Sequence, residues 1–303
     1  FMVIREVFGN MKLHGTDKAL DIFNMTLMIL ILIVIGYPFL NVLSLSFSSE
    51  NYILSGQVNL LPKGFTLSAY KTIINHPSFL GGYLNTIVYT AVQVIISLVL
   101  TSLTAYPLSK SDLPGIPFLK KAVMFTMLFS GGMIQMFLLV KALNLYNTVW
   151  AVTLPGAVAP FNVMIMMTYF KSLPKELNEA AEIDGLGEFG TFLRIVLPLS
   201  KPIIATMVLF FMVGQWNNWF GPLIYFRDND KYPVILLLRN MLFNAQQIAT
   251  NSNMAEDLLK NQESTGEAIK YSTIVLTLAP FMCIYPFMQK YFAQGMMIGS
   301  VKG

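Results

Sequence analysis

Long apolar stretches separated by short polar segments make up most of the sequence, and six of these stretches carry no charged residue. About 20 helical residues cross the roughly 30 Å hydrocarbon core of a bilayer. Each stretch is long enough, so the pattern predicts an all-α membrane protein with six transmembrane helices and both chain ends on one side. The stretches lie between residues 21 and 50, 76 and 110, 121 and 141, 148 and 170, 201 and 227, and 270 and 290.

One segment between the fourth and fifth stretches differs from its surroundings, because it is acidic and contains glycines: NEAAEIDGLGEFGTFLRIVLPLSKP, residues 178–202. Pro174 suits the first turn of a helix, where its missing N–H costs nothing. Good helix formers follow, and Glu176 and Glu179 would lie near the positive end of the helix dipole. The pattern therefore predicts a short polar helix between two membrane spans.

Small residues give this predicted helix two further properties. Ala180 and Ala181 carry almost no side chain, so one face of the helix can approach another surface closely. Gly185 and Gly187 predict that the helix ends there, through a turn with a left-handed residue. Such a helix needs either a groove of another protein or the ends of its own spans to cover it, and a solvated linker is the plainer alternative.

Composition and charge agree with a membrane location and indicate an orientation. Charged residues are 12% of the chain and the mean hydropathy is +0.60, whereas about a quarter of a soluble domain is charged. Lys and Arg are enriched in cytoplasmic loops. Twelve of the twenty therefore favour cytoplasmic termini and a cytoplasmic acidic segment: Arg5, Lys12, Lys18, Lys110, Lys120, Lys121, Lys171, Lys175, Arg194, Lys201, Lys290 and Lys302.

Several kinds of chemistry lack their sequence signals. Cys283 is the one cysteine, and His14 and His76 have no partner at metal-ligand spacing, so we expect no metal site. The chain has no phosphate loop for ATP, no nucleophile elbow and no zinc-protease motif. We therefore expect a protein that is not an enzyme and binds no cofactor itself, and the modest net charge of +4 gives no reason to expect nucleic acid.

The fifth apolar stretch contains polar side chains that hydrocarbon would not tolerate unpaired. Gln215 and Asn218 would share one helical face with Phe211 by their spacing, and amides can hydrogen-bond neutral sugar hydroxyls. Trp216 and Asn217 lie beside that face, and tryptophan rings can stack on sugars. The alternatives are hydrogen bonds between helices and an interfacial aromatic belt, which suits Trp219. The candidate substrate-path residues are Phe211, Gln215, Trp216, Asn217 and Asn218.

The acidic segment resembles the signature of the membrane subunits of binding-protein-dependent ABC importers, in which EAA, three residues, Gly and nine residues precede I-x-L-P. The matching positions are Glu179, Ala180, Ala181, Gly185, Ile195, Leu197 and Pro198. Stretches such as YLNTIVYT, VGQWNNWFGPLIYFRD and QKYFAQGMMIGSVKG are similar to the carbohydrate-importing branch, which includes the maltose-type and lipoprotein-linked oligosaccharide systems. The similarity extends over nearly the whole chain.

This resemblance implies a permease subunit of the MetI-like fold, in a bacterial plasma membrane, that imports a sugar, most simply an oligosaccharide. The seven signature positions would dock a cytoplasmic coupling helix on an ATPase, which uses ATP and Mg²⁺. The implied partners are a second permease, two ATP-binding subunits, an external solute-binding lipoprotein and membrane lipid. One membrane domain would cover residues 1–303, with a cytoplasmic N-terminal segment at 1–21, a coupling loop at 171–197 and an external loop at 227–268.

Two other readings are weighed against this one. A stand-alone secondary sugar transporter would transport without ATP, but such transporters usually carry ionisable groups within the membrane, and the six stretches have none. A membrane-embedded enzyme of glycan or lipid metabolism would need an acid cluster at a membrane-facing cleft.

Within the external loop, a short helix is expected near Asn253 to Asn261.

Overall fold

The computed structural model describes residues 15–110, 114–174, 176–250, 267–280 and 282–283, and these residues form helices and connecting segments with no strand among them. The all-helical fold class is thereby confirmed for the described residues. The chain divides into two compact units, 1–71 with 245–275 and 72–244 with 276–303. The helix expected near Asn253 to Asn261 lies outside the described residues.

The first unit is built around a long apolar helix, α2 (Gly15–Ser46), followed by the short α3 (Glu50–Leu54) and the start of α4 (Ser68–Ile74). Its core contains Leu45, Ile53, Val58, Ala69 and Ala268. Ser272, in the helical residues 267–280, donates a hydrogen bond of 3.2 Å to the carbonyl oxygen of Ser46. The end of α2 is thus tied to a segment more than two hundred residues later in the chain.

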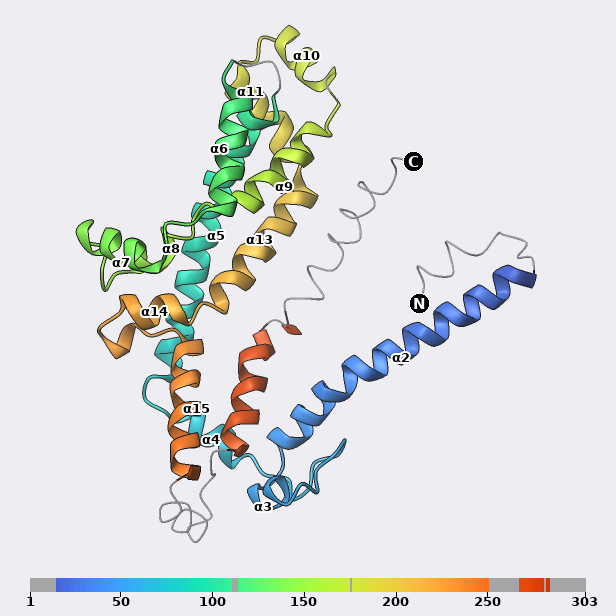
Figure 1. Cartoon of the computed structure of the whole chain (residues 1–303), viewed down its shortest axis with the longest axis vertical. Helices are drawn as coiled ribbons and strands as arrows, with labels where there is room; N and C mark the ends of the chain where they lie inside the picture. The colour runs from blue at the N-terminus through green and yellow to red at the C-terminus, as the bar shows by residue number, and fades with distance from the viewer. Residues whose placement is uncertain (1–14, 111–113, 175, 251–266, 281, 284–303) are drawn as a thin grey trace. The chain divides into compact units, whose positions relative to one another are not determined.

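The second unit is organised around α5 (Phe79–Ser109), which packs along α9 (Pro160–Lys171) and α13 (Lys201–Trp216), as Figure 1 shows. Apolar side chains from these three helices, from the segment before α13 and from the first residue of α6 (Ile116–Leu128) form the main core. Its buried members are Ala105, Tyr106, Leu108, Ile116, Val163, Met166, Met167, Phe170, Phe192, Val196, Ile203, Met207 and Phe211. A single interface therefore fixes the three helices that carry the candidate site residues.

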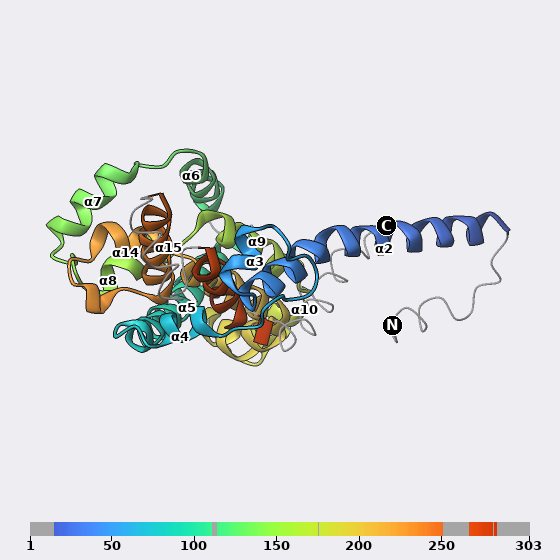
Figure 2. The ribbon, with the colours of Figure 1, turned by 90° about the horizontal axis from the view of Figure 1, so that it is seen from below.

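Several of the predicted spans are interrupted. The third consists of α6 (Ile116–Leu128) and α7 (Met133–Ala142), which meet at 110°. The fourth divides into α8 (Val149–Thr153) and α9, and the fifth into α13 and α14 (Phe220–Tyr225). Figures 1 and 2 place α14 beside α8.

The described helices allow two to four membrane crossings by length and composition. The segments Leu20–Ser46 and Phe79–Ser109 qualify alone. Two bent pairs qualify if each counts as one span: α6 with α7, and residues 188–199 with α13. Six spans therefore stay a prediction.

The predicted external loop contains a three-residue turn, η2 (Asn229–Lys231), and a helix, α15 (Val234–Thr250).

Candidate functional site

The acidic segment forms the helix α10 (Glu176–Ile183), as its sequence predicts. The left-handed turn is also confirmed, because Gly185 has φ +76°. The Gly185 N–H donates to the Glu182 carbonyl at 3.0 Å, and the Leu186 N–H donates to the Ala181 carbonyl at 2.9 Å. These two bonds form a Schellman motif, which satisfies carbonyl groups that the end of a helix otherwise leaves unpaired.

The two alanines of the signature lie in different environments. Ala181 is buried at 1% exposure, whereas Glu179 and Ala180 are exposed. Ile183, which closes the helix, is 86% exposed. Ala180 can therefore allow another surface to come close, while the small side chain of Ala181 serves packing inside this chain.

The chain after the turn returns to the core through α11 (Glu188–Thr191), a π-helical turn η1 (Phe192–Val196) and α12 (Leu197–Leu199). Ile195 and Leu197 of the signature are half-buried, and Leu197 packs against the main core. Pro198 is exposed. The second half of the signature thus holds the segment in place rather than presenting it outward.

A recess of about 290 Å³ opens beside α10. Its lining includes Glu179, together with Lys110 and Lys171 from the ends of α5 and α9. The side-chain oxygen of Asn178, which also lines the recess, is buried and accepts no hydrogen bond from any described residue. Glu179, the acid of the signature, therefore lines a recess that also contains two lysines.

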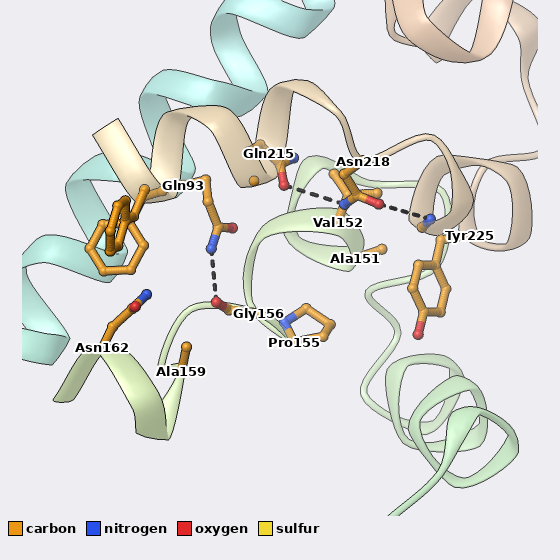
Figure 3. A pocket seen from close by; sticks show the side chains of 14 residues that line it. Gln93, Ala151, Val152, Pro155, Gly156, Ala159, Asn162, Gln215, Asn218 and Tyr225 are labelled. Carbon is orange, nitrogen blue, oxygen red and sulfur yellow. Dashed lines mark hydrogen bonds between the residues drawn. The ribbon is translucent and has the colours of Figure 1, made fainter. Parts of the chain in front are cut away.

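A second cavity, of about 390 Å³, lies among α5, α8, α9, α13 and α14 (Figure 3). None of the residues that line it carries a formal charge. They are Gln93, Ala151, Val152, Pro155, Gly156, Ala159, Asn162, Phe210, Phe211, Gly214, Gln215, Asn218, Gly221 and Tyr225. Its polar groups are amides and a phenol, which hydrogen-bond hydroxyl groups without requiring a charge on the ligand.

Hydrogen bonds fix three of the amides around this cavity. Gln93 donates to the Gly156 carbonyl at 3.0 Å, and Asn218 donates to the Gln215 side chain at 3.3 Å, as Figure 3 shows. The Asn218 oxygen in turn accepts from the Gly221 N–H at 3.0 Å. The side-chain oxygen of Gln93 is buried and accepts no bond from the described part of the chain.

Three of the five predicted path residues line the cavity: Phe211, Gln215 and Asn218. The prediction that Asn218 shares a helical face with Phe211 and Gln215 is wrong, because α13 ends at Trp216. A turn after the helix brings Asn218 next to Gln215 instead. Trp216 is not among the lining residues; it is 6% exposed, with its ring 6.3 Å from that of Tyr83.

Asn217 and Trp219, in the same stretch, are not among the residues that line the cavity. The Asn217 side chain donates to the Val213 carbonyl at 2.9 Å, which is a bond back to the last turn of α13. Trp219 lies under the guanidinium group of Arg239, whose carbon is 3.5 Å from the ring centroid. That contact gives Trp219 a structural role beside α15.

The sequence reasoning missed Gln93 and Asn162. Gln93 belongs to a buried polar stripe along one face of α5, formed by Thr86, Thr90, Gln93, Ser97 and Thr101. Their spacing of three and four residues is visible in the sequence and could have revealed the face. No group of metal-ligating side chains occurs among the described residues.

Comparisons with known proteins agree on one family. The model of the "binding-protein-dependent transport system inner membrane component" family matches residues 14–298. Protein LplC of Bacillus subtilis is 44% identical over 266 residues, covering 88% of this chain and 89% of LplC. The polygalacturonan/rhamnogalacturonan transport system permease protein YtcP of the same organism is 39% identical over 290 residues, covering 95% and 99%.

A solved structure agrees with the sequence relatives. It is that of a bacterial ABC transporter involved in the import of the acidic polysaccharide alginate. One of its chains superposes with a TM-score of 0.81 at 30% identity, covering 93% of this chain and all of that one. The likeness therefore covers both the fold and most of the sequence.

Proposed function

Because the chain belongs to the binding-protein-dependent transport system inner membrane components, as a sugar permease of the MetI-like family, we propose that it imports an oligosaccharide through the cavity among α5, α9 and α13. The observation that carries the proposal is the lining of that cavity, where amides from three elements converge and no charge is present. Polygalacturonan, rhamnogalacturonan and alginate, which the relatives' names give, are polysaccharides. They favour a chain of sugars over a single sugar.

The cavity suits transient binding of sugar hydroxyls. Gln93, Asn162 and Gln215 supply both donors and acceptors. No described residue donates a hydrogen bond to the Gln93 oxygen, so a sugar hydroxyl could donate one. Phe210 and Phe211 supply apolar surface for the faces of sugar rings. Because the lining carries no full charge, only hydrogen bonds and apolar contacts would hold the sugar.

In this proposal, α10 and α11 together (residues 176–191, the α10 segment) supply the coupling to ATP hydrolysis. Glu179 and Ala180 face outward, and Ile183 and Phe189 expose apolar side chains at 86% and 64%. A polar helix with apolar neighbours at its end suits a groove of a partner protein. The partner would be an ATP-binding subunit on the cytoplasmic side, and that subunit would hold ATP and Mg²⁺.

The complete importer would contain this chain, a second permease, two ATP-binding subunits and an external solute-binding lipoprotein, in a bacterial plasma membrane with both termini of this chain in the cytoplasm. Closure of the ATPases would move α10, and the spans would follow as stiff levers. The cavity would then alternate between an outward and an inward opening. This chain contributes the path and the joint and no chemical step, in keeping with a family of transport permeases.

Reconstitution in lipid vesicles tests the proposal. The purified chain with its permease and ATPase partners should take up oligosaccharides from a panel that includes oligogalacturonides, only when ATP and the binding protein are present. The chain alone should take up none. Uptake by the chain alone would instead support a secondary transporter, and ATP-independent uptake by the complex would contradict the proposal.

A further inference from the structure

A second connection joins the α10 segment to the rest of the unit, in addition to the chain itself. Glu188, the first residue of α11, accepts a hydrogen bond of 2.9 Å from the Tyr106 hydroxyl and a second bond from the Lys110 ammonium group. Tyr106 lies in the last turn of α5, and Lys110 is the residue that follows that helix. One carboxylate oxygen thus receives two donors from the same end of α5.

The donors of this contact, which we call the Glu188 link, are held by the core. The Tyr106 ring is 9% exposed and lies 4.9 Å from the Phe192 ring and 6.3 Å from the Phe170 ring. The Lys110 nitrogen stands 5.0 Å from the Tyr106 ring centroid, and its side chain is 21% exposed. Packing within the core therefore holds Tyr106, the α5 side of the link, without help from the Glu188 carboxylate.

Both charges of the link are present at neutral pH. The hydrogen bond from Lys110 lowers the pKa of Glu188 below its ordinary value. Burial lowers the pKa of Lys110, but its hydrogen bonds with Glu188 and Tyr106 outweigh that effect and leave the pKa raised. Protonation of Glu188 would therefore weaken the link only as the pH falls below the ordinary range of a carboxyl group.

The link contributes little to folding, because the Glu188 side chain is 69% exposed and exposed ion pairs add little stability. The aromatic packing around Tyr106 already closes the core there. What the link adds is a direct connection between the residue just after the Gly185 turn and α5, which carries Gln93 of the cavity.

We propose that Glu188 is a positioning residue that makes the α10 segment and the end of α5 move together when the ATPases close. This inference rests on the proposed function, since it takes α10 to be the joint with the ATPase. The covalent chain leads from α10 back to α9 and onward to α13, but not directly to α5. The Glu188 link sends the same movement to α5, so that both walls of the cavity respond.

Distance measurements between spin labels test this without knowledge of the sugar. Cys283 is first replaced by serine, and labels are placed at Glu182 on α10 and Leu103 on α5, both of which are exposed. In the assembled complex, the distance between the labels should be the same without nucleotide and with ATP and vanadate. In the E188A complex it should shift when ATP and vanadate are added.

Charge exchange separates this role from a merely structural one. K110E should show the same nucleotide-dependent shift in the label distance as E188A. The E188K/K110E double variant restores an ion pair and should show no shift. Y106F, which keeps the ring but loses the hydroxyl, should give a smaller shift than E188A. E267Q is the matched control, because it breaks another partly exposed ion pair, with Lys270 at 3.3 Å, and should show no shift.

Three results overturn the inference. They are a nucleotide-dependent distance in the unmodified complex, an unchanged distance in E188A, and a shift that persists in the double variant. If the chain recovers no ATPase partner, or the complex does not hydrolyse ATP, the proposed function fails and the inference fails with it. An active complex in which E188A behaves like the unmodified chain removes the inference alone.

Discussion

Gly185 offers the sharpest test of the α10 joint, because its substitution has an effect that can be assigned to the backbone alone. The residue has φ +76°, and a Cβ built there would meet nothing within 4 Å. A side chain therefore causes no clash, and the cost is that of holding an L-residue in the left-handed region. That cost is about 1 kcal/mol for alanine and approaches about 3 kcal/mol for a β-branched residue.

The Schellman bonds set the scale against which this cost acts. The two bonds, from Gly185 to Glu182 and from Leu186 to Ala181, contribute about 0.5–1.5 kcal/mol each. Valine at position 185 would cancel most of that stabilisation, so the turn would open and α10 would lose its direction relative to α11. Since about 1.4 kcal/mol corresponds to a factor of ten, we expect at least a tenfold loss of ATPase binding.

The assay is recovery of the ATPase subunit with the tagged permease from membranes, normalised to the amount of permease. Gly185→Val should lose recovery and ATP-driven uptake, Gly185→Ala should lose less, and Gly185→Asn should stay near the unmodified level, because asparagine tolerates the left-handed region best. Gly56→Val is the matched control, since Gly56 has φ +66° and open space as well but lies in the other unit. Normal ATPase recovery by Gly185→Val, or an equal loss by Gly56→Val, would refute the reasoning.

Four further outcomes follow from the same structure. Glu179→Lys should leave the amount of permease in the membrane unchanged but reduce ATPase recovery, measured by the same pulldown, because the acid is exposed on α10. Gln215→Leu and Gln93→Leu should each reduce oligosaccharide uptake about fivefold or more with ATPase recovery intact, because each removes hydrogen bonds from the cavity. Ala181→Leu should lower the amount of folded permease in the membrane by overpacking a site of 1% exposure, at about 1–3 kcal/mol. Ala180→Leu, at the exposed neighbour, should leave that amount unchanged and weaken ATPase recovery instead.

The local features of the α10 segment could be predicted from sequence because their causes are local. Helix formers after Pro174 and a glycine at the right distance are sufficient to predict a short helix with a left-handed end, and the structure confirms both. The sequence could not predict that Ala181 is buried while Ala180 is exposed. Which alanine is buried depends on how the following turns fold back against the core, and that is a tertiary property.

The cavity shows the opposite limit. Gln215 and Phe211 were predicted from helical spacing, and that spacing holds up to Trp216. Beyond that residue the helix ends, so Asn218 reached the cavity through a turn that periodicity does not describe. Asn162 follows a break between α8 and α9 at residues 154–159, and the uncharged fourth stretch gave no sign of that break other than its prolines and glycine.

The two candidate regions are physically connected by the helices that form the core. Gln93 and Lys110 lie on or next to α5, about 25 Å apart at the rise of an α-helix. Gln215 lies near the far end of α13, whose first turn follows directly from the I-x-L-P part of the signature. Because α5 and α13 pack tightly against each other, a push at α10 that reached only α13 would have to shear that interface. A push that reaches both helices can move them together, and variants that cut one route should then reduce transport without preventing ATPase binding.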